Sequence, residues 1–323
     1  MVVVTAVTDS KALRACLVNI QEQVREFGGE VLLMMNMAPA ELAAESSRAL
    51  EGLCDRLAFE PRIGKSHALN SAVSLSRGTV IAFTDDDAEP LPGWLAALTS
   101  PLLAPDRDPA LIGCGGPVLP VYPDGATPDW FRAIIEEKST SFLTPCHALG
   151  AVPFDYEPDW TPPIGANCAY RREVFISYHY DPRLGPNRQT GLRGGEDVLL
   201  AKLLLRDGYR LRYFPDARVL HPVYPERMTK ASLRRSYYVN GIARVRVKLA
   251  TATSPRRLKA KLRRKSRREL RALRLKLLLS ALLPLQGRLQ AIRMGWLAKY
   301  ERHRGQLAEL RRSDREEKVG RHV

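Results

Sequence analysis

Three patterns are missing from this sequence of 323 residues: paired cysteines, a long apolar run and an N-terminal leader. The five cysteines are odd in number and widely scattered, with no Cys-x-x-Cys pair, which argues against a disulfide framework or a zinc site. The longest leucine-rich run, 277–285, contains Pro284 and is shorter than the roughly 20 apolar residues of a membrane-spanning helix. No basic stretch precedes the apolar residues after Met1, so we expect no signal peptide and a cytoplasmic protein with reduced thiols.

Negative charge is scarce in the last part of the chain. Residues 230–323 contain 28 Lys and Arg but only 6 Asp and Glu, whereas residues 1–229 contain 22 and 29. The net charge of +15 therefore divides into a mildly acidic body and a strongly basic tail. Because the two parts differ in sign, we expect them to meet different partners. The hydrophobic content of 45% over 323 residues is enough for the chain to bury a full core.

Apolar strands alternate with amphipathic helices in the first third of the chain. Strands are predicted at residues 2–7, 31–35, 57–59 and 79–83, with helices between them that end near residues 27, 53 and 76. A further helix and strand are predicted within 196–214, and the chain turns helical and basic from about residue 229. This order predicts a Rossmann-like α/β fold with a mostly parallel sheet flanked by helices. Ligands of such sheets bind beyond the carboxyl ends of the strands.

Three adjacent aspartates, Asp85, Asp86 and Asp87, follow the fourth predicted strand. Three carboxylates at one strand end repel one another unless a positive group lies among them, and Mg²⁺ or Mn²⁺ takes such oxygen ligands. The Asp-x-Asp spacing turns the side chains of Asp85 and Asp87 toward the same side of an extended backbone. The alternative is an acidic loop ahead of the turn at 90–93. The position after a buried strand favours the metal site.

A second acidic motif, Gly194-Gly195-Glu196-Asp197, directly precedes a helical run. Carboxylates in a first helical turn are favoured by the helix dipole, so ordinary capping explains the pair. The functional interpretation adds that glycines let a ligand approach the backbone and that a carboxylate can accept a proton from an attacking hydroxyl. Both interpretations stay open on these residues alone.

Two single residues also have two interpretations. His221 follows an apolar strand and precedes Pro222, so it is either a third metal ligand at the end of the sheet or a buried, hydrogen-bonded histidine. Lys65 lies within Gly64-Lys65-Ser66, just ahead of a predicted helix, where backbone N–H groups and a cation can bind phosphate. A surface turn is the alternative for this motif.

Five segments occur in a characteristic order: 64–70 (Gly-Lys-Ser-His-Ala-Leu-Asn), 84–95 (Thr-Asp-Asp-Asp-Ala-Glu-Pro, then Pro-Gly-Trp-Leu), 165–172 (Gly-Ala-Asn-Cys-Ala-Tyr-Arg-Arg), 180–185 (Tyr-Asp-Pro-Arg-Leu-Gly) and 194–197. In this order they resemble the family 2 glycosyltransferases of the bacterial type, over roughly residues 1–245. The resemblance implies the GT-A fold and transfer of a sugar from a nucleotide-diphosphate sugar to an acceptor hydroxyl, in glycan or cell-surface polysaccharide biosynthesis.

The resemblance also implies roles for individual residues. It places donor binding at Asn36, Lys65, Asp85 and Asp86, metal ligands at Asp85, Asp87 and His221, and catalysis at Asp197 as the base with Glu196 beside it. Asn36 stands where family members usually carry an acidic residue that meets the nucleobase, so the base is left open. The implied cofactor is Mg²⁺ or Mn²⁺, which stabilises the departing diphosphate while Asp197 deprotonates the acceptor. Inversion at the anomeric carbon is expected, with retention as the alternative.

The expected organisation has three parts. Residues 1–110 form the nucleotide-sugar-binding half and residues 111–228 the acceptor-binding half of one GT-A domain, and residues 229–323 form a basic helical region. The Gly- and Pro-rich segment 184–195 is the candidate for a lid that excludes water from the donor.

The basic tail has a composition typical of membrane-surface segments. Basic residues at 256–268 adjoin leucines up to residue 285, which suits an anionic membrane surface and peripheral attachment to the inner face of the plasma membrane. A carbohydrate or lipid-linked acceptor fits this placement. The alternatives are a solvated helix packed on the acidic body and a dimer contact. A nucleic-acid-binding protein with a basic tail, or a metal-dependent nucleotidyltransferase or hydrolase, remain the other function classes, although the acidic body argues against specific nucleic-acid binding.

Overall fold

The computed structural model describes residues 1–123, 125, 127–135, 140–141, 144–159, 161–281 and 287–319. The chain forms two compact units. The first comprises residues 1–121, 145–190 and 196–222, and the second comprises residues 122–144, 191–195 and 223–323. The expected division of the body at residue 110 concerns which half binds donor and which binds acceptor, and it stays a prediction.

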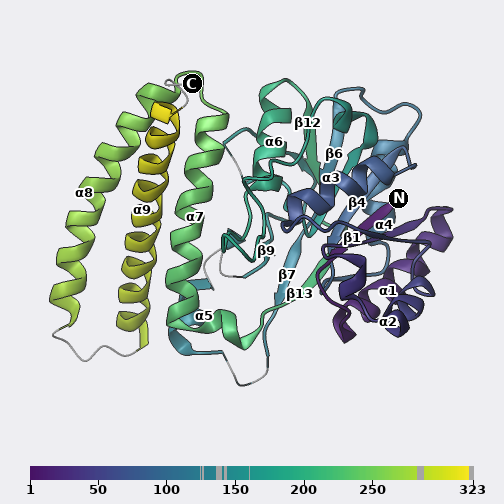
Figure 1. Cartoon of the computed structure of the whole chain (residues 1–323), viewed down its shortest axis with the longest axis horizontal. Helices are drawn as coiled ribbons and strands as arrows, with labels where there is room; N and C mark the ends of the chain where they lie inside the picture. Colours follow the sequence, from purple (N-terminus) through teal and green to yellow (C-terminus); the bar gives the residue numbers. More distant parts are fainter. Residues whose placement is uncertain are drawn as a thin grey trace. The chain divides into compact units, whose positions relative to one another are not determined.

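A large, mostly parallel sheet forms the centre of the first unit (Figure 1). Its eight strands lie in the order β10-β12-β6-β11-β4-β1-β2-β3. They are β1 (Val2–Ala6), β2 (Val31–Met35), β3 (Arg56–Phe59), β4 (Val80–Asp85), β6 (Leu111–Gly115), β10 (Phe154–Asp155), β11 (Asn167–Arg171) and β12 (Arg210–Tyr213). Strands β3, β2, β1 and β4 run parallel, as do β6 and β12, while β11 runs antiparallel between β4 and β6. The prediction of a mostly parallel sheet is confirmed.

Helices cover both faces of this sheet. They are α1 (Lys11–Phe27), α2 (Ala44–Glu51), α3 (Lys65–Leu75), α4 (Trp94–Leu103) and α6 (Glu196–Arg206), with short 3₁₀ helices at Pro39–Glu41 and Arg172–Ile176. Val4 packs in one core with Leu17 of α1, and the next residue back, Val3, packs in another with Leu69 of α3. Alternate side chains of each strand point to opposite faces, so a strand that is apolar throughout serves two cores.

A smaller sheet in the same unit brings distant segments to the end of β4. Strands β5 (Glu89–Pro90), β13 (Val219–Pro222), β7 (Val118–Val121) and β9 (Cys146–His147) lie in that order. β5 starts two residues after Asp87 and pairs with β13, with Leu220 opposite Glu89. Because β5 follows the aspartates so closely, this pairing carries His221 to the same place.

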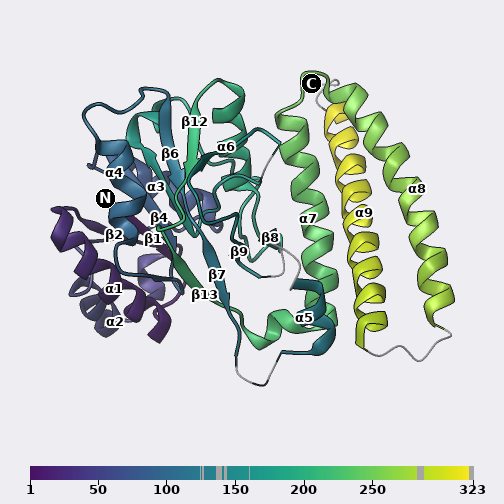
Figure 2. The same ribbon diagram turned by 180° about the vertical axis from the view of Figure 1, so that it is seen from behind.

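The second unit is largely helical (Figure 2). It contains α5 (Asp129–Ile135), α7 (Lys230–Ala250), α8 (Pro255–Ala281) and α9 (Gly287–Val319), with strand β8 (Thr140–Ser141) and a 3₁₀ helix at Pro225–Met228. A Cβ atom added to Gly305 would lie 1.9 Å from the carbonyl oxygen of Tyr238, and one added to Gly241 would lie 2.1 Å from that of Arg302. Glycine at these two positions therefore lets α7 and α9 approach closely. The predicted basic helical C-terminal extension is confirmed.

The cysteines and the lengths of the apolar helices can be examined in the structure. All five cysteines are free, as expected for a chain without a disulfide framework. In the described parts of the chain, no helix has a stretch both long and apolar enough to span a bilayer.

Candidate active site at the carboxyl end of the parallel strands

Asp85, Asp87 and His221 form one compact group of ligand atoms. Asp85 is the last residue of β4, and Nε2 of His221 lies 3.4 Å from Oδ2 of Asp85 and 3.3 Å from Oδ1 of Asp87. One ligand atom from each of the three residues lies within 4.8 Å of the other two. Two carboxylates and an imidazole at this separation are a donor set that suits a divalent cation. The structure therefore brings together the three residues predicted as metal ligands.

The ring of His221 is oriented by the backbone. Its Nδ1 lies 3.2 Å from the carbonyl oxygen of Pro222, and since a carbonyl only accepts hydrogen bonds, Nδ1 carries the proton. Nε2 then faces the two aspartates, which is the orientation of a metal-binding histidine held by its other nitrogen. Burial lowers the pKa of His221, but the neighbouring carboxylates of Asp85 and Asp87 outweigh burial and raise it above its usual range.

Lys65 neutralises part of the aspartate cluster. Its Nζ forms an ion pair with Oδ1 of Asp85, the oxygen that does not face His221. Burial alone would raise the pKa of Asp85, yet the charge of Lys65 and the contact with His221 hold it well below its usual range. Asp85 is therefore ionised throughout the physiological range, and Lys65 remains charged beside it.

Asp86 shows that the cluster still lacks positive charge. Burial, followed by repulsion from Asp87 and Asp85, raises the pKa of Asp86 to about 7. A carboxyl group in this state gains from any cation bound nearby, because the cation offsets both the repulsion and the lost hydration. The electrostatics of the cluster thus favour cation binding, in agreement with its geometry.

A second pair of carboxylates begins α6. Asp197 is held by the backbone on both oxygens: Oδ2 accepts a hydrogen bond from Gly165 N at 2.9 Å, and Oδ1 accepts one from Val198 N at 2.7 Å. Glu196 is only 3% exposed, and its Oε2 has no hydrogen-bond partner among the residues that the structure describes. Burial, and then the charge of Asp197, raise the pKa of Glu196 to about 8. Glu196 is therefore mainly protonated at neutral pH, whereas Asp197 is fixed in a defined orientation.

Lys65 connects the two acidic groups. Its charge interacts with Asp85, Glu196 and Asp197, and a Cβ atom added to Gly165 would lie 3.9 Å from its Nζ and 3.7 Å from Oδ2 of Asp197. Site residues predicted on two separate segments of the sequence therefore lie close to one lysine. Because Lys65 is the first residue of α3, the loop ahead of this helix sets its position.

Asn36 holds that loop. Its Nδ2 donates to the carbonyl oxygens of Glu60 at 2.9 Å and Arg62 at 2.8 Å, and its Oδ1 accepts from Gly64 N at 2.9 Å. The side chain is 7% exposed and makes three hydrogen bonds to one short segment. Donor binding by Asn36 stays a prediction, and the structure adds a contact that the sequence analysis missed: Asn36 positions the residues ahead of Lys65.

Asn167 is another functional support that the sequence analysis did not single out. The residue is fully buried, and its Oδ1 accepts a hydrogen bond from the indole nitrogen of Trp94 at 2.8 Å. Its Nδ2 donates to the carbonyl oxygens of Pro117 at 2.9 Å and Ala217 at 2.6 Å. It thereby connects β11 to the segments that lead into β7 and β13. These partners lie 50 or more residues away, so no local pattern could have revealed the role.

The first residues of the candidate lid are tied to α3. Ser66 Oγ donates to the carbonyl oxygen of Leu184 at 2.9 Å, Lys65 N donates to that of Pro186 at 2.9 Å, and Asn187 Nδ2 donates to that of Ile63 at 2.9 Å. Any closing movement of segment 184–195 would therefore involve the residues after Asn187. The lid itself stays a prediction.

Glu60 gives a pH-dependent test of this loop. Its carboxylate accepts from Arg62 Nε at 2.8 Å, from Arg62 N at 2.9 Å and from Ser71 Oγ, and the bond from the Arg62 side chain is the main cause that lowers its pKa to about 2. A lowered pKa stabilises the fold above the unfolded-state pKa near 4.5, and the stabilisation is lost as the pH falls toward 2. We expect Glu60→Gln to reduce the unfolding free energy by about 2 kcal/mol at pH near 7 and by progressively less below pH about 4.5.

Urea unfolding of both proteins across this pH range measures the difference. Exposed Glu41→Gln is the matched control and should show no such gap. A gap that stays constant with pH would mean that the charge of Glu60 does not support the loop.

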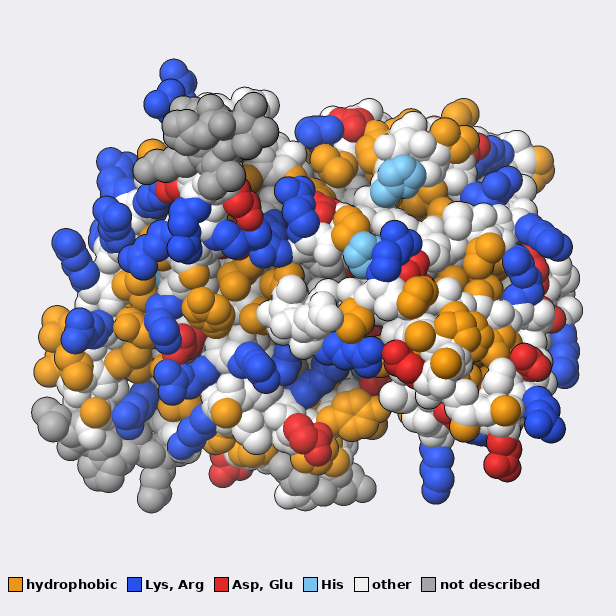
Figure 3. Space-filling model, in the orientation of Figure 1, with side chains coloured by type: hydrophobic (Ala, Val, Ile, Leu, Met, Phe, Trp, Pro, Cys, Tyr) orange, Lys and Arg blue, Asp and Glu red, His pale blue; other side chains and the backbone are white. Residues whose placement is uncertain are grey.

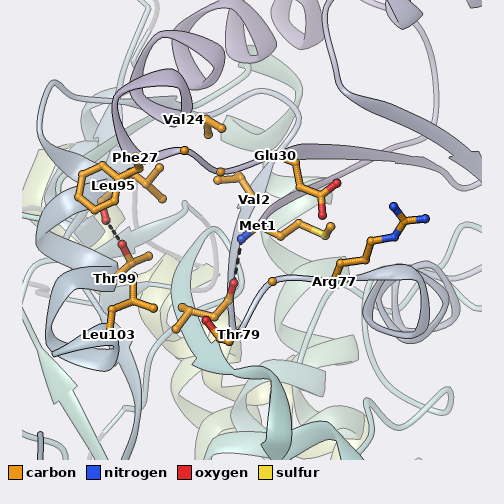
Figure 4. A pocket seen from close by; sticks show the side chains of 14 residues that line it. Met1, Val2, Val24, Phe27, Glu30, Arg77, Thr79, Leu95, Thr99 and Leu103 are labelled. Carbon is orange, nitrogen blue, oxygen red and sulfur yellow. Dashed lines mark hydrogen bonds between the residues drawn. The ribbon is translucent and has the colours of Figure 1, made fainter. Parts of the chain in front are cut away.

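A separate hollow of about 440 Å³ lies at the other end of the parallel strands, where β1 and β4 begin (Figure 4). It is lined by the starts of β1 and β4, at Val2 and Val80, and by apolar side chains such as Phe27 and Leu95. In open α/β sheets ligands bind at the carboxyl ends of the strands, and this hollow lies at the amino ends of β1 and β4. We therefore assign the chemistry to the aspartate end.

Part of the chain matches a known protein family. Residues 1–152 match the model of the family "Glycosyl transferase family 2". A glucosyl-dolichyl phosphate glucuronosyltransferase of Haloferax volcanii is 26% identical over 167 residues, which cover 51% of this chain and 49% of that protein. The chain thus spans about half the length of the curated relative it matches.

The structure was also compared with solved structures. A mannosyltransferase from Pyrobaculum calidifontis, PcManGT, in complex with GDP-Man and Mn²⁺, superposes with a TM-score of 0.54 at 17% identity, covering 94% of this chain and 86% of that one. GalNAc-T7 with UDP, GalNAc and Mn²⁺ superposes with a TM-score of 0.48 at 18% identity, over 75% of this chain and 48% of that one. The likeness to PcManGT shows the GT-A fold.

Proposed function

We propose that this chain, a family 2 glycosyltransferase with the GT-A fold, transfers a sugar from a nucleotide-diphosphate sugar to an acceptor hydroxyl with the help of Mg²⁺ or Mn²⁺. The observation that carries the proposal is the group of Asp85, Asp87 and His221, whose ligand atoms lie within 4.8 Å of one another at the end of β4. This is where a doubly wound sheet binds its ligands. Asp85 and Asp87 lie inside the segment that matches the family, and His221 lies beyond it.

On the donor side, the residues at the end of β4 bind the diphosphate. Asp85, Asp87 and His221 would hold the divalent ion, and the bound ion would supply positive charge to the oxygen that leaves the anomeric carbon. Lys65 adds a second positive charge next to Asp85. Asp86 and Asn36 are assigned to the nucleoside part of the donor, in keeping with their places on the loops that follow β4 and β2.

On the acceptor side, Asp197 is the general base. Backbone N–H groups of Gly165 and Val198 fix its carboxylate, so its remaining lone pairs have a constant direction. Glu196, mainly protonated beside it, does not compete for the proton of the acceptor hydroxyl at neutral pH. Deprotonation by Asp197 on the face opposite the leaving diphosphate gives inversion at the anomeric carbon.

A thermal-shift screen tests the proposal. We expect one or a few nucleotide sugars to raise the melting temperature only when Mn²⁺ or Mg²⁺ is present, since donor and ion bind as a unit. With an acceptor, the product should be a nucleoside diphosphate. Release of pyrophosphate would instead indicate a nucleotidyltransferase. Salt-sensitive polynucleotide binding without any effect of nucleotide sugars would indicate a nucleic-acid-binding protein.

The acceptor and the place of action belong to the same proposal. We assign a carbohydrate or lipid-linked acceptor and a position on the cytoplasmic face of an anionic membrane, because residues 256–285 join basic and leucine-rich sequence. Residues 282–285 of this segment lie outside the described residues.

A further inference from the structure

Exposed apolar side chains gather at one end of the α8–α9 hairpin. Leu275, Leu278 and Leu279 near the end of α8 are each 59% exposed, and Leu289 and Ile292 near the start of α9 are 58% and 49% exposed. We call these five residues the hairpin tip. Leu278 and Leu279 lie three and four residues after Leu275, so both lie on the same side of the helix as Leu275. Large side chains of this kind are normally buried, and their clustering on a surface marks a binding site.

Basic residues continue the same face of α8 away from the tip. The exposed residues Arg257, Lys261, Arg264, Arg268 and Arg271 precede Leu275 at spacings of three and four. In all, α8 carries twelve Lys and Arg and one acidic residue. Figure 3 shows Lys and Arg side chains beside hydrophobic ones over α8, at the left of the view.

Two acidic residues of α9 contact basic residues on the face of α8 that packs against α9. Glu317 and Asp314 form ion pairs with Lys259 and Arg263, which are buried and partly buried in the hairpin. These contacts hold α8 against α9 and use Lys259 and Arg263, not the basic residues of the outer face. The outer face of α8 therefore presents positive charge along most of its length and leucine at its end.

An aromatic residue lies next to the tip. Trp296 of α9 is partly exposed, and Nζ of Lys276 lies 5.6 Å from the centre of its ring. Tryptophan and lysine together are typical of the boundary between lipid headgroups and acyl chains, where the indole is partly wet and the ammonium reaches phosphate. The pair lies at the tip itself, because Lys276 stands between Leu275 and Leu278, and the basic face continues from there toward the start of α8.

We propose that the hairpin tip inserts into the headgroup–acyl boundary of an anionic bilayer while the basic face of α8 lies on the lipid phosphates. A nucleic acid would supply phosphates but nothing apolar to cover the leucines. A second copy of the chain would bring two faces of equal positive charge together. Only an anionic lipid surface offers an acidic layer above an apolar one, which matches the order of charges and leucines on α8.

Flotation of the full chain with lipid vesicles tests this inference. We expect binding to phosphatidylcholine vesicles that contain phosphatidylglycerol, and binding at least about tenfold weaker to vesicles of phosphatidylcholine alone. The double variant Leu278→Ser, Leu279→Ser should weaken binding to the anionic vesicles by roughly tenfold or more, since it removes apolar side chains from lipid contact. Ile176→Ser is the matched control, because Ile176 is 82% exposed in the first unit and should leave binding unchanged.

A spectroscopic measurement adds a second criterion. The tryptophan emission of the full chain should shift to shorter wavelength on anionic vesicles, and Trp296→Phe should remove most of that shift. The inference is overturned if the leucine variant binds like the parent, if binding ignores lipid charge, or if the parent self-associates through these leucines without binding vesicles.

The inference rests on the membrane position in the proposed function and fails separately from the proposed chemistry. Both the leucine variant and Ile176→Ser leave the Asp85–His221 group untouched, so the Mn²⁺-dependent thermal shift with the donor should be the same in all three proteins. Loss of vesicle binding with an unchanged donor response tests the tip alone. A parent protein that binds vesicles but no nucleotide sugar would instead overturn the proposed function.

Discussion

Asp197→Asn is expected to lower the rate of sugar transfer by about a thousandfold while donor affinity changes by no more than about twofold. The amide keeps the size of the carboxylate, and its single oxygen can still accept the hydrogen bond from Gly165 N, while its NH₂ group cannot accept the one from Val198 N. What it loses is the basicity needed to take the proton of the acceptor hydroxyl. Donor binding depends on the aspartate group at the end of β4, which the substitution does not touch.

Glu196→Gln is the matched control for this prediction. Glu196 is the adjacent residue and is mainly protonated at neutral pH, because burial and the charge of Asp197 raise its pKa to about 8. Glutamine resembles the protonated acid, so most of the activity should remain. Steady-state transfer rates and donor titrations of both variants show which of the two carboxylates is the base. If Glu196→Gln stops transfer and Asp197→Asn does not, the two roles are reversed.

Short-range patterns in the sequence predicted most of the large sheet. Each of β1 to β4 is a short, largely apolar run next to a helix. The helix after β1 also has a cap, Ser10, whose Oγ accepts from Leu13 N at 3.0 Å. What the patterns could not predict is the order of the strands. β11 lies antiparallel between β4 and β6 because of side chains that meet only after folding, and Asn167 is the clearest case.

The single residues of the candidate site were predictable from the sequence, but the contacts that bring them together were not. Asp85 and Asp87 stand out because three acids end a buried strand, but His221 is 136 residues from Asp85, and only the pairing of β5 with β13 joins them. The hydrogen bonds of Asn36 to the loop at 60–64 depend on the same kind of distant contact. In the tail, composition indicated a basic and leucine-rich segment, while the exposed tip followed only from which face of α8 packs on α9.

Among the site residues, substitution of Asp87 is expected to have the largest effect on donor binding, because Asp87 is a proposed metal ligand. We expect Asp87→Ala to abolish the metal-dependent part of nucleoside diphosphate binding, a loss of about a hundredfold or more in affinity when Mn²⁺ is present and little change in its absence. Oδ1 of Asp87 lies 3.3 Å from Nε2 of His221, so its removal opens one side of the three-residue group. Titration of the diphosphate with and without Mn²⁺ measures the metal-dependent part of its affinity. Electron paramagnetic resonance measures the binding of Mn²⁺ directly.

Glu89→Ala is the control that separates ligation from charge. Glu89 is an exposed acid two residues after Asp87, so its removal changes the net charge of the same segment equally but takes no ligand from the group. Equal losses in the two variants would mean that Asp87 acts through general electrostatics. Asp85 makes a poorer test, because Asp85→Ala would leave the buried cation of Lys65 without its ion-pair partner and would therefore lower stability as well as affinity. Among the residues that the structure describes, Asp87 pairs with His221 and not with a lysine. A stable Asp87→Ala protein that binds diphosphate normally in Mn²⁺ would therefore show that the ion is held elsewhere.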